Sequence, residues 1–191
     1  MHRIDWTTSI GKLVALEPEI SEVDAHAAAL AAGYNDPANA VLMGHSAPIA
    51  PDEVVESYED MRDDGARLFL LFLDGELVGD ADLRGMDEGA AEFAFMIAAP
   101  NQQGKGLGTK FATMVHAFGF RALGLATIYA SVVPSNTASR RVFEKLGYVL
   151  DDSPAARAFA DEPGDVVLAI DRATFERVNA AALADIRVDE R

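Results

Sequence analysis

The sequence predicts an α+β fold in which helices flank a mixed, mostly antiparallel central sheet of about six to seven strands. Two observations carry this prediction. The apolar run LFLLFL at residues 68–73 is followed by Asp74-Gly75, a pair typical of a tight hairpin turn, and residues 76–84 supply the returning strand. Residues 91–98 then form a strand that leads through a glycine-rich stretch into a helix.

The N-terminal third adds one strand and two helices. Residues 12–16 are predicted to form a strand, and Ser21 is a candidate N-cap for a helix that extends to Tyr34, with Asp24 in its first turn. A second helix follows Pro51 and ends before Gly65. The segment between these helices, residues 35–50, has loop punctuation at both ends and is a candidate lid or substrate wall.

The C-terminal half continues with helices and strands. Strands are expected at residues 127–133, 148–150 and 166–170, a helix at residues 135–146, and a terminal amphipathic helix at about residues 173–186. No internal repeat or flexible linker interrupts residues 1–191, so we expect a single domain with its core at residues 12–170. Apolar residues recur at helical spacing after the glycine stretch, at Leu107, Phe111, Met114, Val115 and Phe118.

The composition excludes several classes of protein. The formal net charge of −15 repels nucleic acid and favours a cationic partner, although such acidity also serves solubility alone. The absence of cysteine excludes disulfides, thiolate metal sites and a thiol nucleophile. The N-terminus lacks a signal-peptide pattern, and no apolar run approaches the roughly 20 residues that span a bilayer, so a cytoplasmic protein without membrane contact is expected. No metal is expected, because no metal-ligand spacing is found among His2, His26, His45 and His116.

The stretch NQQGKGLGTK at residues 101–110 places glycines at positions 104, 106 and 108, directly before a helix. Its spacing does not fit a P-loop, which needs four residues between the first glycine and a Gly-Lys-Ser/Thr ending, nor a Gly-x-Gly-x-x-Gly dinucleotide fingerprint. Glycine N–H groups and a helix that starts near Leu107 suit an anion such as a pyrophosphate. A flexible connection that binds nothing is the alternative.

Two motifs together resemble those of the GNAT acetyltransferases. They are Gln103-x-x-Gly106-x-Gly108 at the end of a strand, and Asn136-x-x-Ser139 followed by Gly147-Tyr148. The order of predicted elements over residues 12–170 matches the fold of that family. The opening helices and the segment ASRRVFEKLGY resemble its RimJ/RimL-type branch of ribosomal-protein N-acetyltransferases most closely. The resemblance implies acetyl-CoA as cosubstrate and a sheet that is splayed between its fourth and fifth strands.

The resemblance also implies which residues contact the cosubstrate. The pantetheine arm would lie in the splay and pair with backbone groups of Met96, Ile97 and Ala98, with the Met96 amide directed at the thioester carbonyl. Asn136, which we expect to cap its helix, and Ser139 would contact the same arm. The pyrophosphate would bind the loop and helix start formed by Gln103, Gly104, Lys105, Gly106, Leu107, Gly108 and Thr109.

Acetylation of an amine requires a base, because an amine of the lysine type has a pKa of about 10. Glu92 has the spacing to Gln103 that is seen in family members with a glutamate base, and it would act directly or through a water. A strand-edge acid that faces solvent is the alternative.

The usual general acid is absent, because Phe143 stands where many members of the family have a tyrosine. Ser139 is a substitute acid by resemblance to the RimL-like branch, or else a helix serine that only hydrogen-bonds the cosubstrate. A thiol with a pKa of about 8.5 can also leave as thiolate without an acid. Tyr34, Tyr129 and Tyr148 are other polar aromatics, although such residues are more typically part of the packing.

These observations predict an acetyl-CoA-dependent N-acetyltransferase that moves the acetyl group directly from the thioester to a primary amine. The acceptor would be a protein N-terminus, a lysine, or a small amine such as a polyamine or an antibiotic, bound by a monomer or homodimer. A non-catalytic acyl-CoA-binding sensor or interaction module is the alternative. The residues that determine acceptor specificity are expected between Tyr34 and Tyr58, with His45 as a candidate.

Asp80 and Asp82 point to the same face of one strand, and the simplest expectation is that both face water.

Overall fold

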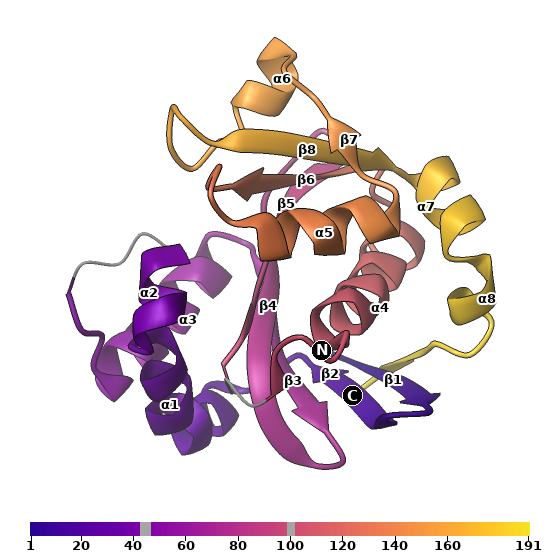
Figure 1. The fold of residues 1–191 in the computed structure, drawn as a ribbon. Coiled ribbons are helices and arrows are strands. Elements are labelled where there is room, and N and C mark those ends of the chain that lie inside the picture. Colours follow the sequence, from indigo (N-terminus) through magenta and orange to yellow (C-terminus); the bar gives the residue numbers. More distant parts are fainter. Residues whose placement is uncertain (43–46, 99–101) are drawn as a thin grey trace.

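The structure is a computed structural model that describes residues 1–42, 47–98 and 102–191, and within these residues nine strands form one sheet (Figure 1). The strands are β1 (His2–Thr8), β2 (Gly11–Leu16), β3 (Arg67–Leu73), β4 (Glu76–Asp87), β5 (Ala90–Ile97), β6 (Thr127–Val132), β7 (Val149–Leu150), β8 (Val166–Asp171) and β9 (Arg187–Glu190). Their order is β7-β8-β6-β5-β4-β3-β2-β1-β9. Only β5 and β6 pair in parallel among these strands, so the predicted mixed, mostly antiparallel fold is confirmed.

Helices cover both faces of this sheet. They are α1 (Ile20–Tyr34), α2 (Pro37–Leu42), α3 (Pro51–Asp63), α4 (Leu107–Arg121), α5 (Thr137–Leu146), α6 (Pro154–Arg157), α7 (Arg172–Val178) and α8 (Ala180–Leu183). In Figure 1, α1, α2 and α3 lie together on one side of β4, and α4 lies on the other. In the described part of the chain, no helix is long and apolar enough to cross a membrane.

The apolar run in β3 explains why two separate cores exist. Leu68 and Leu70 belong to the core formed with α1 and α3, whereas Phe69 and Leu71 belong to the core formed with α4. Successive side chains of a strand point to opposite faces, so a strand covered on both sides has no polar face. The run without alternation therefore reflects burial on both faces.

The sheet divides between β5 and β6. The pairing of these strands runs only from Ala90 opposite Thr127 to Glu92 opposite Tyr129, although β5 continues to Ile97 and β6 to Val132. Beyond Glu92 the two strands diverge, and this split is the expected splay between the fourth and fifth predicted strands. The last part of β5 is therefore without a strand partner on this edge.

The boundaries of the first helices follow their caps. The Glu19 backbone N–H donates to the Glu22 carboxylate at 2.8 Å, so α1 begins at Ile20 and the prediction of Ser21 as its N-cap was wrong. Glu22, three residues after the N-cap residue Glu19, provides the capping carboxylate, and Ser21 lies inside the helix. The second predicted helix is α3, which begins at Pro51, and the Glu53 carboxylate accepts the Ala50 N–H at 2.6 Å. The short helix α2 was not predicted, because it lies within the segment expected to be a loop.

Two strands were not predicted. β1 pairs with β2, and β9 pairs with β1, so the sheet has more strands than the six to seven expected. The terminal helix expected at residues 173–186 is instead divided at Asn179 into α7 and α8, and the chain returns as β9. The Asn179 amide donates to the Leu146 and Phe175 carbonyls, and asparagine competes with helix hydrogen bonds in this way.

Gly79 allows β4 to approach β5 closely beside the split. A Cβ at Gly79 would lie 1.9 Å from the Met96 carbonyl oxygen, a backbone atom that has no room to move aside. We expect Gly79→Ala to lower the free energy of unfolding by about 2–4 kcal/mol, measured by urea denaturation. Gly164→Ala is the control, because a Cβ there meets nothing within 4 Å. Equal stability of the two variants would contradict this reading of the β4–β5 contact.

Candidate active site

Two clefts meet where β5 and β6 diverge. One has a volume of about 350 Å³ and lies along the glycine loop and α5, and the other has a volume of about 490 Å³ and extends from the split to α1 and α3. Groups bound in the two clefts could react with each other where the clefts join. Both clefts are lined at this junction by Leu42, Phe95, Met96, Asn136 and Ser139.

The loop cleft, as we call the smaller one, is built on the glycine stretch. Gly106 is the N-cap of α4 with φ of 80°, and Gly104 has φ of 74°, which is the left-handed conformation that favours glycine. A Cβ at either position would meet nothing within 4 Å, so the space beside this backbone is open. Open space at a helix N-terminus suits an anion. Of the predicted loop residues, those that line the cleft are Gln103, Gly104, Gly106, Leu107, Gly108 and Thr109.

The cations beside this cleft differ from the prediction. Lys105 is not among the lining residues, and its ammonium instead donates to the Gln102 side chain at 3.3 Å. Arg141 and Lys145 of α5 line the cleft, and sequence reasoning missed them. Their spacing of four residues places both on one face of the helix, which was the available signal.

Gln103 fixes the loop to the rest of the site. Its amide Nε2 donates to the Ile97 carbonyl and to the Asn39 side chain, each at 3.0 Å. Asn39 is buried and donates in turn to the Gly33 carbonyl at 2.9 Å. The Ala98 N–H donates to the Val78 carbonyl at 2.8 Å. Two of the backbone groups expected to contact a pantetheine arm therefore have partners within the protein, and their predicted role stays a prediction, as does that of Met96.

Among the described residues that line both clefts there is no tyrosine. Asn136 caps α5 as predicted, because its side chain accepts the Ser139 N–H at 3.0 Å. Phe143 lies one helical turn further on and packs its ring against Phe93 and Phe95. The hydroxyl that α5 brings to both clefts is that of Ser139.

The other tyrosines do not replace it. Tyr148 is buried and its hydroxyl lies 2.5 Å from His116 Nε2, and burial raises the pKa of this phenol well above 10.0. Tyr129 stacks on Phe159. Tyr34 donates to Asp80, as described below.

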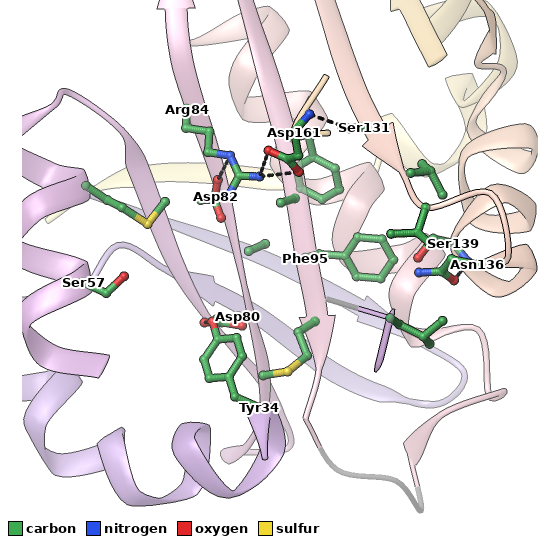
Figure 2. A pocket seen from close by; sticks show the side chains of 18 of the residues that line it. Tyr34, Ser57, Asp80, Asp82, Arg84, Phe95, Ser131, Asn136, Ser139 and Asp161 are labelled. Atoms are coloured by element: carbon green, nitrogen blue, oxygen red, sulfur yellow. Dashed lines mark hydrogen bonds and ion pairs between the residues drawn. The ribbon is translucent and has the colours of Figure 1, made fainter. Parts of the chain in front are cut away.

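The acid cleft, as we call the larger one, contains a polar stripe on adjacent strands (Figure 2). On β4 the stripe consists of Asp80, Asp82 and Arg84 at alternate positions, which share one face of the strand. The antiparallel register places these residues opposite Met96, Ala94 and Glu92 of β5, in that order. The stripe thus runs from the junction at Met96 to an ion pair at Glu92.

Asp80 is held by two helices. The Tyr34 hydroxyl of α1 and the Tyr58 hydroxyl of α3 both donate to Asp80 Oδ2, at 2.5 Å and 2.9 Å. Asp80 is only 5% exposed, so the expectation that it faces water was wrong. Burial raises the pKa of its carboxyl from 3.8 to about 6, while the two phenol hydrogen bonds oppose that rise.

Asp82 has fewer partners. Its Oδ1 is buried without a hydrogen-bond partner among the described residues, and the nearest cation, Arg84 Nε, lies 3.8 Å away. Burial raises the pKa of the Asp82 carboxyl from 3.8 to about 7, and Arg84 only partly offsets this rise. A buried carboxylate oxygen without a hydrogen bond is uncommon in native structures and is often found at a functional site.

Arg84 ties three acids together. It binds Glu92 through two hydrogen bonds of 3.0 Å and 3.1 Å, and it also reaches Asp161 at 3.3 Å. Glu92 is 7% exposed, so the alternative of a solvent-facing acid was wrong. Burial raises the pKa of Glu92, and the hydrogen bonds from Arg84 lower it. Glu92 itself does not line either cleft, and its assignment as the base stays a prediction.

The loop after α6 contributes further acids that the sequence did not indicate as a site. Ser131 of β6 anchors this loop, because its hydroxyl donates to Asp165 at 3.0 Å and accepts the Asp161 N–H at 3.0 Å. Among its described lining residues the acid cleft has a single cation, Arg84, against six acids: Glu53, Asp80, Asp82, Asp161, Glu162 and Asp165. The cleft therefore favours a positively charged guest.

The segment predicted as a lid or wall is partly described. Leu42 and Ile49 line the acid cleft, and the Asn35 side chain forms two 2.8 Å hydrogen bonds with the Ile49 backbone. His45, the candidate substrate contact, lies outside the described residues. Nowhere in residues 1–42, 47–98 and 102–191 do three or more His, Asp or Glu side chains gather as a metal site.

The candidate site therefore consists of a split sheet, a glycine loop suited to an anion on one side and an acid cleft on the other. The sequence profile of the acetyltransferase (GNAT) domain matches residues 19–149. Since this match covers more than half of the chain, the protein belongs to the GNAT acetyltransferase family.

Known proteins resemble the chain over different lengths. Spermidine N(1)-acetyltransferase of Escherichia coli (strain K12) is 32% identical over 93 residues, so the match spans about half of each protein (48% of this chain and 50% of the relative). The structure of Mycobacterium smegmatis RimJ with CoA-disulfide has a TM-score of 0.70 at 18% identity, over 97% of this chain and 96% of that one. The aminoglycoside acetyltransferase AAC(6')-Ib with coenzyme A and kanamycin has a TM-score of 0.68 at 21% identity, over 86% and 96%.

The raised pKa of Asp82 has a consequence for stability. Folding disfavours the ionised carboxylate, so the resulting destabilisation is complete above pH 7 and disappears as the pH falls below 3.8. We expect Asp82→Asn to raise the free energy of unfolding by about 1–4 kcal/mol at pH 8 and by less than half as much at pH 5. Chemical denaturation at both pH values measures this.

Asp5→Asn is the matched control for this experiment. The hydrogen bond from Arg3 lowers the pKa of the Asp5 carboxyl, so the same substitution there should not stabilise the protein at pH 8. A gain at Asp82 that is independent of pH would show that ionisation is not its cause.

Proposed function

We propose that this protein is an acetyl-CoA-dependent N-acetyltransferase whose acceptor is the primary amine of a small polycation, such as a polyamine or an aminoglycoside. The observation that carries the proposal is the junction of a loop cleft suited to an anion with a cleft lined by six acids and one cation among its described residues. A cosubstrate that carries phosphates and an acceptor that carries ammonium groups match these two clefts.

Acetyl-CoA fits the loop cleft by its charge. The pyrophosphate would bind at Gly104, Gly106 and the N-terminus of α4, with Arg141 and Lys145 adding attraction. The pantetheine arm would follow the split along Met96 toward the junction. This direction brings the thioester to the end of the acid cleft.

The reaction is a direct transfer. The neutral amine nitrogen attacks the thioester carbonyl carbon, a C–N bond forms and the C–S bond breaks. The nitrogen loses a proton to a base, and the sulfur leaves as a thiolate or takes up a proton. Glu92 as the base and Ser139 as the acid are the predictions drawn from the sequence. The position of Ser139 at the junction supports its part of that assignment.

The charge of the acid cleft supports a cationic acceptor over a neutral one. One relative is named a spermidine N(1)-acetyltransferase, and the similar structure of AAC(6')-Ib contains kanamycin. Spermidine and kanamycin are both small polycations. Acids of the stripe and acids of the loop after α6 lie on different elements of the cleft. An acceptor with two or more ammonium groups could contact both sets.

The single-domain organisation, the cytoplasmic location and the monomeric or dimeric state stay predictions.

A panel of amines tests the proposal. With saturating acetyl-CoA, we expect spermidine, spermine or kanamycin to release CoA at least about 100-fold faster than a peptide with a neutral N-terminal segment, followed with a thiol reagent. Acetylation is checked by mass spectrometry of the acceptor. If acetyl-CoA binds tightly and no amine accelerates CoA release, the protein is a sensor and not a transferase.

Gly106 provides a separate test of the loop cleft. Gly106→Val would fill the open space that we assign to the pyrophosphate, and we expect the Kd for CoA to rise by about 100-fold or more, measured by calorimetry. Gly124→Val is the matched control, because Gly124 has a similar φ of 74° and equally open space but lies outside both clefts. Similar CoA affinity in the two variants would contradict the assignment.

A further inference from the structure

We propose that Asp80, held by Tyr34 and Tyr58, is the group that accepts the proton of the attacking amine. This inference rests on the proposed function, because it concerns the acetyl transfer at the same junction. It replaces Glu92 in that role and makes Glu92 a positioning residue that acts through Arg84.

The first argument is position. Asp80 lies directly opposite Met96 in the β4–β5 register, and paired residues of antiparallel strands have Cβ atoms about 5 Å apart on the same face. Glu92 lies four residues before Met96 on the same strand, which corresponds to about 13 Å. A thioester at the junction is therefore within reach of Asp80 and far from Glu92.

The second argument is availability. Glu92 uses both carboxylate oxygens to bind Arg84 and does not line the acid cleft. Asp80 lines the cleft, and the phenols of Tyr34 and Tyr58 both donate to its Oδ2. Two hydrogen bonds from different helices fix the carboxylate in one orientation, which a base beside a reacting nitrogen needs.

The third argument concerns protonation. The carboxyl of Asp80 has a pKa of about 6, so it is ionised in the range in which an amine can react, and it is more basic than an ordinary aspartate. Burial raises the pKa of Asp80, and the hydrogen bonds from Tyr34 and Tyr58 lower it. The titratable and charged groups that surround the stripe come from several elements. They are Tyr34 from α1, Tyr58 and Glu53 from α3, Asp82 and Arg84 from β4, Glu92 from β5 and Asp161 from the loop after α6.

The step conserves atoms and charge. The acceptor binds as an ammonium ion, loses one proton to solvent and attacks the carbonyl carbon as the free amine. The second N–H proton then passes to Asp80 as the C–N bond forms and the C–S bond breaks. Protonated Asp80 returns its proton to the thiolate or to solvent, and the amide product, no longer charged at that nitrogen, is released.

The test compares three neutral variants of similar shape: Asp80→Asn, Asp82→Asn and Glu92→Gln. With acetyl-CoA and the best acceptor of the panel, we expect Asp80→Asn to lower kcat by about 10²–10⁴-fold and to remove the part of the ascending limb of the kcat–pH profile that titrates near pH 6. The part due to ionisation of the acceptor ammonium should remain, so the limb that is compared below is the one near pH 6. Asp82→Asn should mainly raise KM, because it removes one acid of the cleft. Glu92→Gln should lower kcat by less than Asp80→Asn and keep the limb. CoA affinity measured by calorimetry verifies that each variant is folded.

Variants of Tyr34 and Tyr58 allow a second test, with a result that is not expected if Asp80 has only a structural role. Their hydrogen bonds lower the pKa of Asp80, so Tyr34→Phe and Tyr58→Phe should each move the ascending limb of the kcat–pH profile to higher pH. An active wild type in which Asp80→Asn keeps its kcat, or in which Glu92→Gln alone removes the limb, overturns the proposal and leaves the proposed function standing. A wild type that acetylates no amine is a failure of the function itself.

Discussion

The site depends on one constraint, which is that β5 and β6 pair over only three residue pairs and then separate. When two paired strands separate in the interior of a protein, their backbone N–H and C=O groups lose their partners and need others. Here the protein supplies some of them itself, through Gln103 at Ile97 and Val78 at Ala98. The remainder of the split is where the loop cleft and the acid cleft join.

Buried acids are the second feature of the site, and they are retained at a cost in stability. The pKa values of Asp80 and Asp82 are raised by burial, which means that the folded state disfavours their charged forms at neutral pH. Two phenols and one guanidinium compensate for part of this effect. Replacement of such groups by neutral ones is often stabilising in other proteins. Their presence along one stripe that ends at the junction is what a function in binding or proton transfer would require.

Some elements of the fold could be predicted from the sequence, and others could not. The β3–β4 hairpin and the start of α3 were predictable, because Asp74-Gly75 and Pro51 act locally. The strand β9 was not, because its partner β1 lies at the other end of the chain. Among site residues, the glycine loop and Asn136 followed from local motifs. Arg141 and Lys145 were indicated only by their helical spacing, and the acids of the loop after α6 carried no motif. Asp80 was misjudged, since a strand position alone does not say what covers it.

The sequence by itself determined the family, the glycine loop and the strand–loop–helix unit around it, because spacing and backbone conformation along a short segment fix those features. It also determined the excess of acidic over basic residues. The tertiary structure decided where that acid gathers. Helices α1 and α3 pack tyrosines onto Asp80, and the loop after α6 brings Asp161 to Arg84, so the acids meet through contacts between segments that are distant in the chain. Such contacts are set by packing, which no local pattern records.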